Sequence, residues 1–175
     1  MDASAPLYAA LRTIPDFPQP GIQFKDITPL LADPTLVRLA LDLLAAPYRA
    51  HTITKVVAIE ARGFLFGSLL ADALGAGFIP VRKHGKLPYA TLQETYALEY
   101  GTDTIEMHTD ALDANDHVLI HDDVLATGGT ALATTKLVAQ TGAFLVGYAF
   151  LGELGFLNGS SVLEPHGPVH AVLHL

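Results

Sequence analysis

The sequence predicts an α/β fold in which helices flank a mainly parallel central sheet. Short apolar runs rich in β-branched residues recur along the chain, and such runs are typical of buried strands. They lie at 54–59, 77–81, 118–120, 143–151 and 169–173. Helical patterns of about ten to fifteen residues separate several of them, as the crossovers of a parallel sheet require. Ligands of such sheets bind at the carboxyl ends of the strands.

Before the first strand, the chain is predicted to be mostly helical. Residues 7–14 show a short helical pattern, whereas the prolines and the glycine of 15–21 predict an irregular segment. Asp33 and Pro34 begin a longer helix, because proline is favoured in a first turn. Its apolar positions keep the helical period as far as Leu44.

The middle of the chain predicts a helix, a strand and a hairpin. The apolar pattern over 63–74 predicts a helix that ends at Gly75, as helices often do. The strand at 77–81 follows, and a polar stretch over 82–91 leads to alternating residues that predict a hairpin turning at 101–103.

The last part of the chain predicts a strand at 118–120, a glycine-rich turn and a helix at 129–140, before the two final strands. No repeat, low-complexity segment or long linker interrupts the sequence. We therefore expect residues 1–175 to form one domain.

Composition excludes several classes of protein. Ten Lys and Arg residues against eighteen Asp and Glu residues give a net charge of −8, so we expect no nucleic-acid partner. The absence of cysteine excludes disulfides, thiolate zinc sites and a cysteine nucleophile. With no signal-peptide pattern and no apolar stretch of about 20 residues, a cytoplasmic protein without a membrane partner is expected. Only 16% of residues are charged, which favours an apolar contact between subunits.

The most informative run is 118–130. A buried strand leads to the adjacent acids Asp122 and Asp123, and a loop of small residues then begins a helix. The backbone N–H groups of such a loop form a nest for a phosphate group. No lysine follows the glycines, so this is not the nucleoside-triphosphate loop, and no dinucleotide-binding glycine pattern occurs.

Acids beside a phosphate nest need an explanation, because they would repel a phosphate. A ribose 5-phosphate supplies one: the phosphate occupies the nest while Asp122 and Asp123 bind the sugar hydroxyls. The alternative is a solvated acidic strand end followed by a glycine turn. The complete arrangement of strand, two acids, small-residue loop and helix is much rarer than such a turn, and it favours the functional interpretation.

This run resembles the phosphoribosyl-diphosphate motif of the type I phosphoribosyltransferases. Further resemblance to the family lies in 14–29, 60–67, 81–88 and 98–101, in family order, and it covers roughly residues 14–155. The final twenty residues carry no usable family motif. The resemblance implies the type I fold, with a small N-terminal hood at about 14–30 and a flexible catalytic loop with its hairpin at about 82–103.

The resemblance also implies a set of site residues. Those expected to bind phosphoribosyl diphosphate are Asp122, Asp123, Ala126, Thr127, Gly128, Gly129, Thr130, Glu60, Ala61, Arg62, Arg82, Lys83 and Lys86. Those expected to bind the purine are Gln23, Phe24, Lys25 and Arg62, with Leu154 as a further wall. Glu99, Arg62 and Lys86 are the candidate catalytic residues, Glu99 as proton acceptor near the purine, and Tyr100 is expected to enter the closed site.

Two of these expectations also have support from the residues alone. Arg62 follows a predicted strand, and a guanidinium at such a strand end suits a diphosphate; the alternative is a surface charge at a helix start. Arg82, Lys83 and Lys86 place three of the ten cations within five positions, although a cluster of charges in a loop is usually only solvated. Whether the loop residues act within their own subunit or across a dimer is left open.

The histidines and one acidic run allow more than one interpretation. His121 stands where the family usually has an apolar residue, and either a satisfied core histidine or a group that perturbs the acids is possible. His84 also departs from the family pattern. His170 and His174 share a strand face, but two ligands do not make a zinc site, and exposed histidines on an edge strand are favoured. The acidic run 110–116 lacks the pattern of a calcium loop and predicts a surface turn.

The implied reaction moves 5-phosphoribosyl from its diphosphate to a purine, assisted by Mg²⁺ that is bound through the substrate diphosphate and ribose hydroxyls. Adenine is the favoured base, giving AMP and diphosphate in purine salvage, and hypoxanthine, guanine or xanthine are the alternatives. A homodimer is expected. Two rival classes are a regulator that only senses phosphoribosyl diphosphate and a phosphosugar-binding module without catalysis. The net charge of −8 opposes the first, and the basic loop with Glu99 opposes the second.

Overall fold

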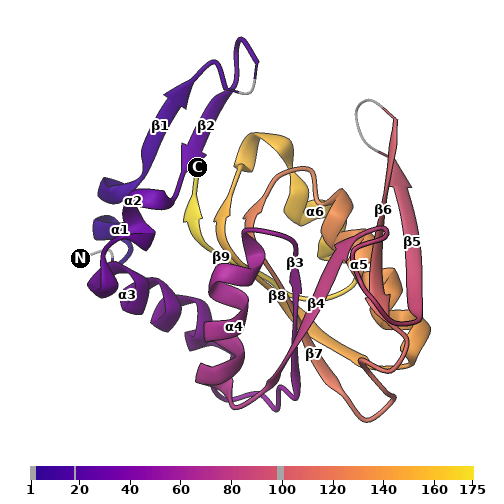
Figure 1. The fold of residues 1–175 in the computed structure, drawn as a ribbon. Coiled ribbons are helices and arrows are strands. Elements are labelled where there is room, and N and C mark those ends of the chain that lie inside the picture. The colour runs from indigo at the N-terminus through magenta and orange to yellow at the C-terminus, as the bar shows by residue number, and fades with distance from the viewer. Residues whose placement is uncertain (1–2, 18, 98–100) are drawn as a thin grey trace.

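The computed structural model, described here for residues 3–17, 19–97 and 101–175, has a central seven-stranded sheet in the order β5-β6-β4-β3-β7-β8-β9. Its strands are β3 (Lys55–Ile59), β4 (Gly77–Lys83), β5 (Thr91–Ala97), β6 (Thr102–His108), β7 (His117–Leu125), β8 (Phe144–Glu153) and β9 (Val169–His174). Five strands run parallel, and β5 and β6 pair antiparallel at one edge. The predicted mainly parallel α/β sheet is confirmed (Figure 1).

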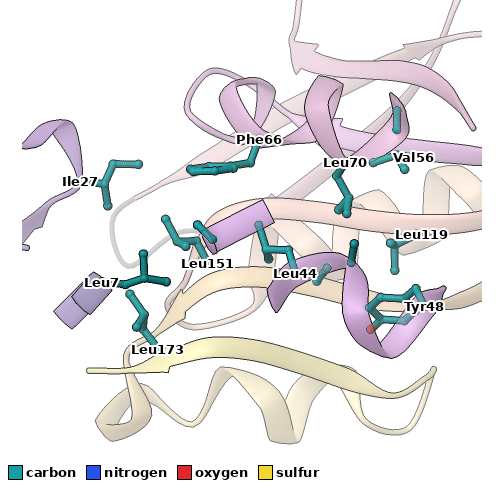
Figure 2. Close-up of a cluster of buried hydrophobic side chains, with 14 of the residues drawn as sticks. Leu7, Ile27, Leu44, Tyr48, Val56, Phe66, Leu70, Leu119, Leu151 and Leu173 are labelled. Carbon is teal, nitrogen blue, oxygen red and sulfur yellow. The ribbon is translucent and has the colours of Figure 1, made fainter. Parts of the chain in front are cut away.

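Helices cover both faces of the sheet. They are α1 (Ala5–Ala10), α2 (Thr28–Leu31), α3 (Pro34–Ala45), α4 (Gly63–Leu74), α5 (Gly129–Thr141) and α6 (Gly159–Leu163), with short 3-10 turns at Ala46–Tyr48 and Gly155–Leu157. Because neighbouring strand residues point to opposite faces, Leu119 and Ile120 of β7 enter separate cores. Helices α1, α3 and α4 build the first core, shown in Figure 2, and α5 and α6 build the second.

Several predicted elements occur where the sequence places them. Helix α4 has the predicted bounds and ends at Gly75, whose φ of 66° is the left-handed conformation that favours glycine. Helix α3 begins at Pro34, where the Asp33 carboxylate accepts hydrogen bonds from the backbone of Thr35 and Leu36.

The N-terminal segment differs from its prediction. The helix expected at 7–14 is α1 at Ala5–Ala10, and of the described residues in the segment expected to be irregular, 15–21, only Pro15 lies in a strand. Strand β1 (Arg12–Pro15) pairs antiparallel with β2 (Gln23–Asp26), with Ile14 opposite Phe24. Pro15 is the last residue of β1. This hairpin is a separate two-stranded sheet, and it lies on the opposite side of the molecule from β5–β6, which form one edge of the central sheet (Figure 1).

Several strand ends also differ from their predictions. Strand β4 continues through Lys83 and β7 through Leu125, because β6 and β8 run beside those residues and complete the ladders. The turn predicted at 101–103 is wrong for Thr102 and Asp103, which lie in β6. Short helices α2 and α6 have no counterpart in the predictions.

None of the helices within the described residues is long and apolar enough to cross a membrane.

Candidate active site

The candidate site lies where the carboxyl ends of β3, β4 and β7 meet. Residues 60–62 follow β3, residues 82–86 end β4 and continue into its loop, and residues 122–130 link β7 to α5. Strand β3 lies between β4 and β7 in the sheet, so the three segments are brought to one edge. The site predicted from separate sequence segments is therefore assembled by the sheet order.

Asp122 and Asp123 lie inside β7 rather than after it. Asp122 pairs with Phe150 of β8, and the ladder continues to Leu125. Successive residues of a strand point to opposite faces. Accordingly Asp122 lines the cavities beside the phosphate nest and the basic loop, whereas the side chain of Asp123 faces Arg62. The two acids do not share one environment.

Arg62 joins Asp123 to the N-terminal hairpin. Its Nε lies 2.9 Å from Oδ2 of Asp123, whose side chain is only 5% exposed, and its guanidinium lies 5.2 Å from the centre of the Phe24 ring. This arrangement is an ion pair combined with a cation–π contact. Arg62 does stand at the start of α4 with a side chain that is 44% exposed, but its guanidinium is also held between Asp123 and Phe24, so it is not only a solvated surface charge.

A cavity of about 180 Å³ lies beside this pair. Its lining includes the four residues predicted for the purine, Gln23, Phe24, Lys25 and Arg62, together with Leu154, the predicted further wall. Phe24 is half-buried and also contacts Phe17 edge-to-face at 5.2 Å. The cavity therefore combines an aromatic ring, aliphatic walls and backbone groups, which suits a flat heteroaromatic ligand.

Burial raises the pKa of both β7 carboxyl groups. For Asp122 the neighbouring charge of Asp123 raises the pKa further, to well above the usual value. For Asp123 the positive charge of Arg62 opposes the effect of burial. Burial disfavours the charged form of each acid, and only Asp123 has a cation directly against it.

The phosphate nest has the predicted form. Helix α5 begins after Gly128, whose φ of 83° requires a residue without a side chain. Residues 126–130 line a cavity of about 80 Å³ together with Asp122. The first N–H groups of a helix lack partners within the helix, so the start of α5 offers donors to an anion.

The predicted diphosphate cations are not free, because acids of the same chain hold them. Arg82 Nη2 and Lys86 Nζ lie 2.9 Å and 2.8 Å from Oε1 of Glu60, and the backbone N–H of Lys83 donates to Oε2. Burial would raise the pKa of Glu60, but these hydrogen bonds outweigh it and lower the pKa to about 2. Arg82 and Lys86 thus bind a residue of their own subunit.

A second acid that sequence reasoning missed shapes the loop after β4. Glu106 of β6 is 2% exposed and accepts hydrogen bonds from the backbone of Lys86 and Leu87 at 3.0 and 2.9 Å. His84, one of the departures from the family pattern, lies 3.4 Å from the other oxygen of Glu106. Glu106 therefore organises the turn that carries Lys86.

The β5–β6 hairpin contributes two further residues that sequence reasoning missed. Lys83 Nζ lies 3.1 Å from Oδ2 of Asp103, and the Thr130 hydroxyl donates to the Tyr96 hydroxyl at 3.1 Å. All four side chains line a cavity of about 280 Å³ that also contains Asp122. The only signal in the sequence is the alternating pattern of the hairpin, which does not reveal its partners.

The C-terminal segment packs against the backbone of the phosphate nest. A Cβ atom on Gly159 would overlap the carbonyl oxygen of Ala126, and one on Gly128 would lie 2.9 Å from the carbonyl oxygen of Gly159. Ser160 also hydrogen-bonds the Glu153 carboxylate at the end of β8. Gly159 is thus a further residue of the site, in the part of the chain without a family motif.

The structure decides between the interpretations of His121. Its side chain is fully buried, and Nδ1 lies 2.8 Å from the carbonyl oxygen of Ala149. It is therefore a core histidine bonded to β8, although its Nε2 atom finds no hydrogen-bond partner among the residues that the structure describes. Burial lowers its pKa from 6.5 to about 4, against the smaller effect of the Ala149 bond, so it is neutral at pH 7.

The remaining predictions concern the histidines of β9, possible metal ligands, the acidic run 110–116, and Glu99 and Tyr100. His170 is half-buried and bonds the carbonyl of Leu43, so only His174 matches the exposed edge histidine. Within the described ranges, no group of three or more His, Asp or Glu residues could hold a metal ion. Asp116 of the acidic run 110–116 accepts a hydrogen bond from Thr54. Glu99 and Tyr100 lie outside the described residues.

This fold and this site define a phosphoribosyltransferase. The family model of the phosphoribosyl transferase domain matches residues 28–155. An adenine phosphoribosyltransferase of Edwardsiella ictaluri is 60% identical over 88% of this chain and 84% of its own. One from Myxococcus xanthus is 57% identical over 91% and 86%.

Solved structures agree with these relatives. The adenine phosphoribosyltransferase of Rhodothermus marinus is 61% identical, covers 99% of this chain and 98% of its own, and superposes with a TM-score of 0.95. That of Saccharomyces cerevisiae, complexed with an imino-altritol bisphosphate and adenine, is 43% identical over 98% of both chains with a TM-score of 0.92. The chain belongs to the adenine phosphoribosyltransferase family.

We predict that Gly159→Ala disturbs the nest. The new methyl group would displace the Ala126 carbonyl and press on the Leu125 side chain, so the loop that cradles the phosphate must move. Affinity for ribose 5-phosphate should fall about 10- to 100-fold, as small displacements of a positioning group do. Isothermal titration calorimetry measures this.

Gly155→Ala is the matched control, because nothing lies within 4 Å of its Cβ position and neither glycine has a positive φ. Circular dichroism confirms that both variants fold. Equal affinities in the two variants would exclude a positioning role for Gly159.

We also predict that His121 makes stability depend on pH. In the unfolded chain His121 binds a proton below about pH 6.5, whereas in the folded protein it does so only near pH 4. Its effect on the free energy of unfolding is therefore absent above pH 6.5, and the protein loses stability as the pH falls from 6.5 toward 4. By pH 5 the loss should reach about 2 kcal/mol. Urea denaturation at several pH values measures it.

His121→Leu, or His121→Val if that variant folds better, should remove this part of the pH dependence. The exposed His166→Gln serves as control and should retain it. A wild-type and a His121→Leu protein with parallel stability curves between pH 7 and 5 would contradict the assignment.

Proposed function

We propose that the chain transfers 5-phosphoribosyl from phosphoribosyl diphosphate to N9 of adenine and releases AMP and diphosphate. The observation that carries this proposal is the order of three adjoining cavities. The base cavity shares Val124 and Ala126 with the nest, and the nest shares Asp122 and Thr130 with the cavity of the basic loop. The first cavity would hold the base, the nest the 5-phosphate of the sugar, and the cavity of the basic loop the diphosphate.

The chemistry follows from this arrangement. As the bond from C1 to the diphosphate oxygen breaks, positive charge develops on the sugar, by analogy with other glycosyl transfers. The protein holds the 5-phosphate in the nest, positions the ribose hydroxyls at Asp122 and places the base against Phe24. Arg82, Lys83 and Lys86 neutralise the charge that develops on the leaving diphosphate. Glu99 is proposed as the proton acceptor for the purine.

Mg²⁺ is proposed to bind through the diphosphate and ribose hydroxyls of the substrate. The diphosphate and ribose hydroxyls would lie in the cavity that Asp122 lines, and they would supply the oxygen ligands that Mg²⁺ prefers, so no direct protein ligand is proposed. When bound, the metal would neutralise part of the diphosphate charge. The protein's own residues hold the sugar and the two phosphate groups.

We further propose a cytoplasmic homodimer. Leu65 and Leu69 lie one turn apart on α4 and are 45% and 40% exposed, which is unusual for large aliphatic side chains. Together with the low share of charged residues, they indicate a face that a second copy would cover.

The activity is tested by measuring diphosphate release from phosphoribosyl diphosphate with each purine in turn. We expect release with adenine, and much less with hypoxanthine, guanine or xanthine. Release with another purine but not with adenine would overturn the base assignment. Binding of phosphoribosyl diphosphate without release with any purine would favour a sensing or binding protein.

We predict that Asp122→Asn lowers kcat/KM for phosphoribosyl diphosphate by about 10²- to 10³-fold, because the sugar loses a hydrogen-bonding carboxylate in a partly dry site. Steady-state kinetics at saturating adenine measure this. Asp42→Asn is the matched control, since Asp42 is exposed and pairs with Arg49 at 2.7 Å. Wild-type turnover in Asp122→Asn would remove Asp122 from the mechanism.

A further inference from the structure

Two acids hold the cations of the basic loop, and they differ in how open they are. Glu60 is 10% exposed and accepts hydrogen bonds from three residues of one strand and loop. Asp103 is 23% exposed, and its partner Lys83 is 61% exposed. Glu60 is built into the turn, whereas the pair of Lys83 and Asp103 lies open to the cavity.

Asp103 is held in place by its own strand and by the neighbouring strand. Its other oxygen accepts the backbone N–H of Thr104 at 2.9 Å, and Tyr96 is its partner across the β5–β6 ladder. Tyr96 in turn accepts the hydroxyl proton of Thr130 in the nest. Asp103 therefore presents a fixed negative charge on the wall of the diphosphate cavity.

We infer that Asp103 is an internal counter-ion of Lys83 that competes with diphosphate for this ammonium group, and so weakens diphosphate binding and promotes its release. The identity of the anion rests on the proposed function. An arriving diphosphate must share Lys83 with a carboxylate, or displace it, and either event places like charges close together in a partly enclosed site. Burial would raise the pKa of Asp103, but Lys83 lowers it, so the carboxylate is ionised at pH 7.

Asp103→Asn tests the inference, because it removes the charge and keeps the shape. Inorganic diphosphate with Mg²⁺ should bind about three- to tenfold more tightly to this variant, the range expected for a partly exposed ion pair. Diphosphate should also become a stronger product inhibitor. Calorimetric titration gives the affinity, and initial rates at several diphosphate concentrations give the inhibition constant.

Two further variants distinguish competition for Lys83 from a general effect of removing one negative charge. Glu94 on β5 pairs with Lys136 at 2.9 Å, the same kind of ion pair outside the cavity, so Glu94→Gln should bind diphosphate as the wild type does. In a Lys83→Gln background, Asp103→Asn should no longer tighten binding, since the contested ammonium is gone.

The inference is overturned if Asp103→Asn binds diphosphate no more tightly than the wild type, or if the gain persists in the Lys83→Gln background. Diphosphate release by the wild type with adenine tests the proposed function separately. Normal release by the wild type with unchanged diphosphate affinity in Asp103→Asn rejects only the role of Asp103. Absence of diphosphate binding to an active wild type also rejects it.

Discussion

The ion pair of Arg62 and Asp123 is the interaction on which the geometry of the site depends. A carboxylate this deeply buried would be costly without a cation against it, so Arg62 is held at the start of α4. The same guanidinium lies against the Phe24 ring and thereby joins the N-terminal hairpin to the sheet. One side chain consequently joins the cavity beside Phe24 to β7, the strand that carries Asp122, the proposed sugar-binding acid.

The charges of this protein are organised as pairs within the site as well as on its surface. The total of −8 suggests an acidic exterior around a basic cleft. Yet Glu60, Asp103 and Glu106 face the cations or the backbone of the basic loop, and two acids lie on β7. These acids position the cations before any ligand arrives, at the cost of competing with it. The site is preorganised by its own counter-ions.

Patterns among neighbouring residues were sufficient to predict secondary-structure elements and the phosphate nest. They did not predict which residues far apart in the sequence contact one another. Helix α4 and the turn before α5 follow from apolar periodicity, glycine placement and the end of a buried strand, which are properties of neighbouring residues. The pairing of Glu60 with Arg82 joins residues 22 apart, and it appears only once β3 and β4 lie side by side. For the same reason, the β1–β2 hairpin was not predicted, and most of β1 was assigned to the helical pattern at 7–14: the proline-rich turn is visible in the sequence, but the register of the two strands is not.

The support of the nest explains why the functional unit extends past the region that carries the family motifs. A loop of small residues can approach a phosphate closely, but it has no side chains with which to anchor itself. Its support must come from backbone packed against backbone, and this requires a glycine on the supporting side as well. Gly159 meets that requirement behind Ala126 and Gly128, and α6 is held to the end of β8 through Ser160 and Glu153. The segment after residue 155 therefore supports the proposed phosphate site, although no pattern in its sequence indicates phosphate binding.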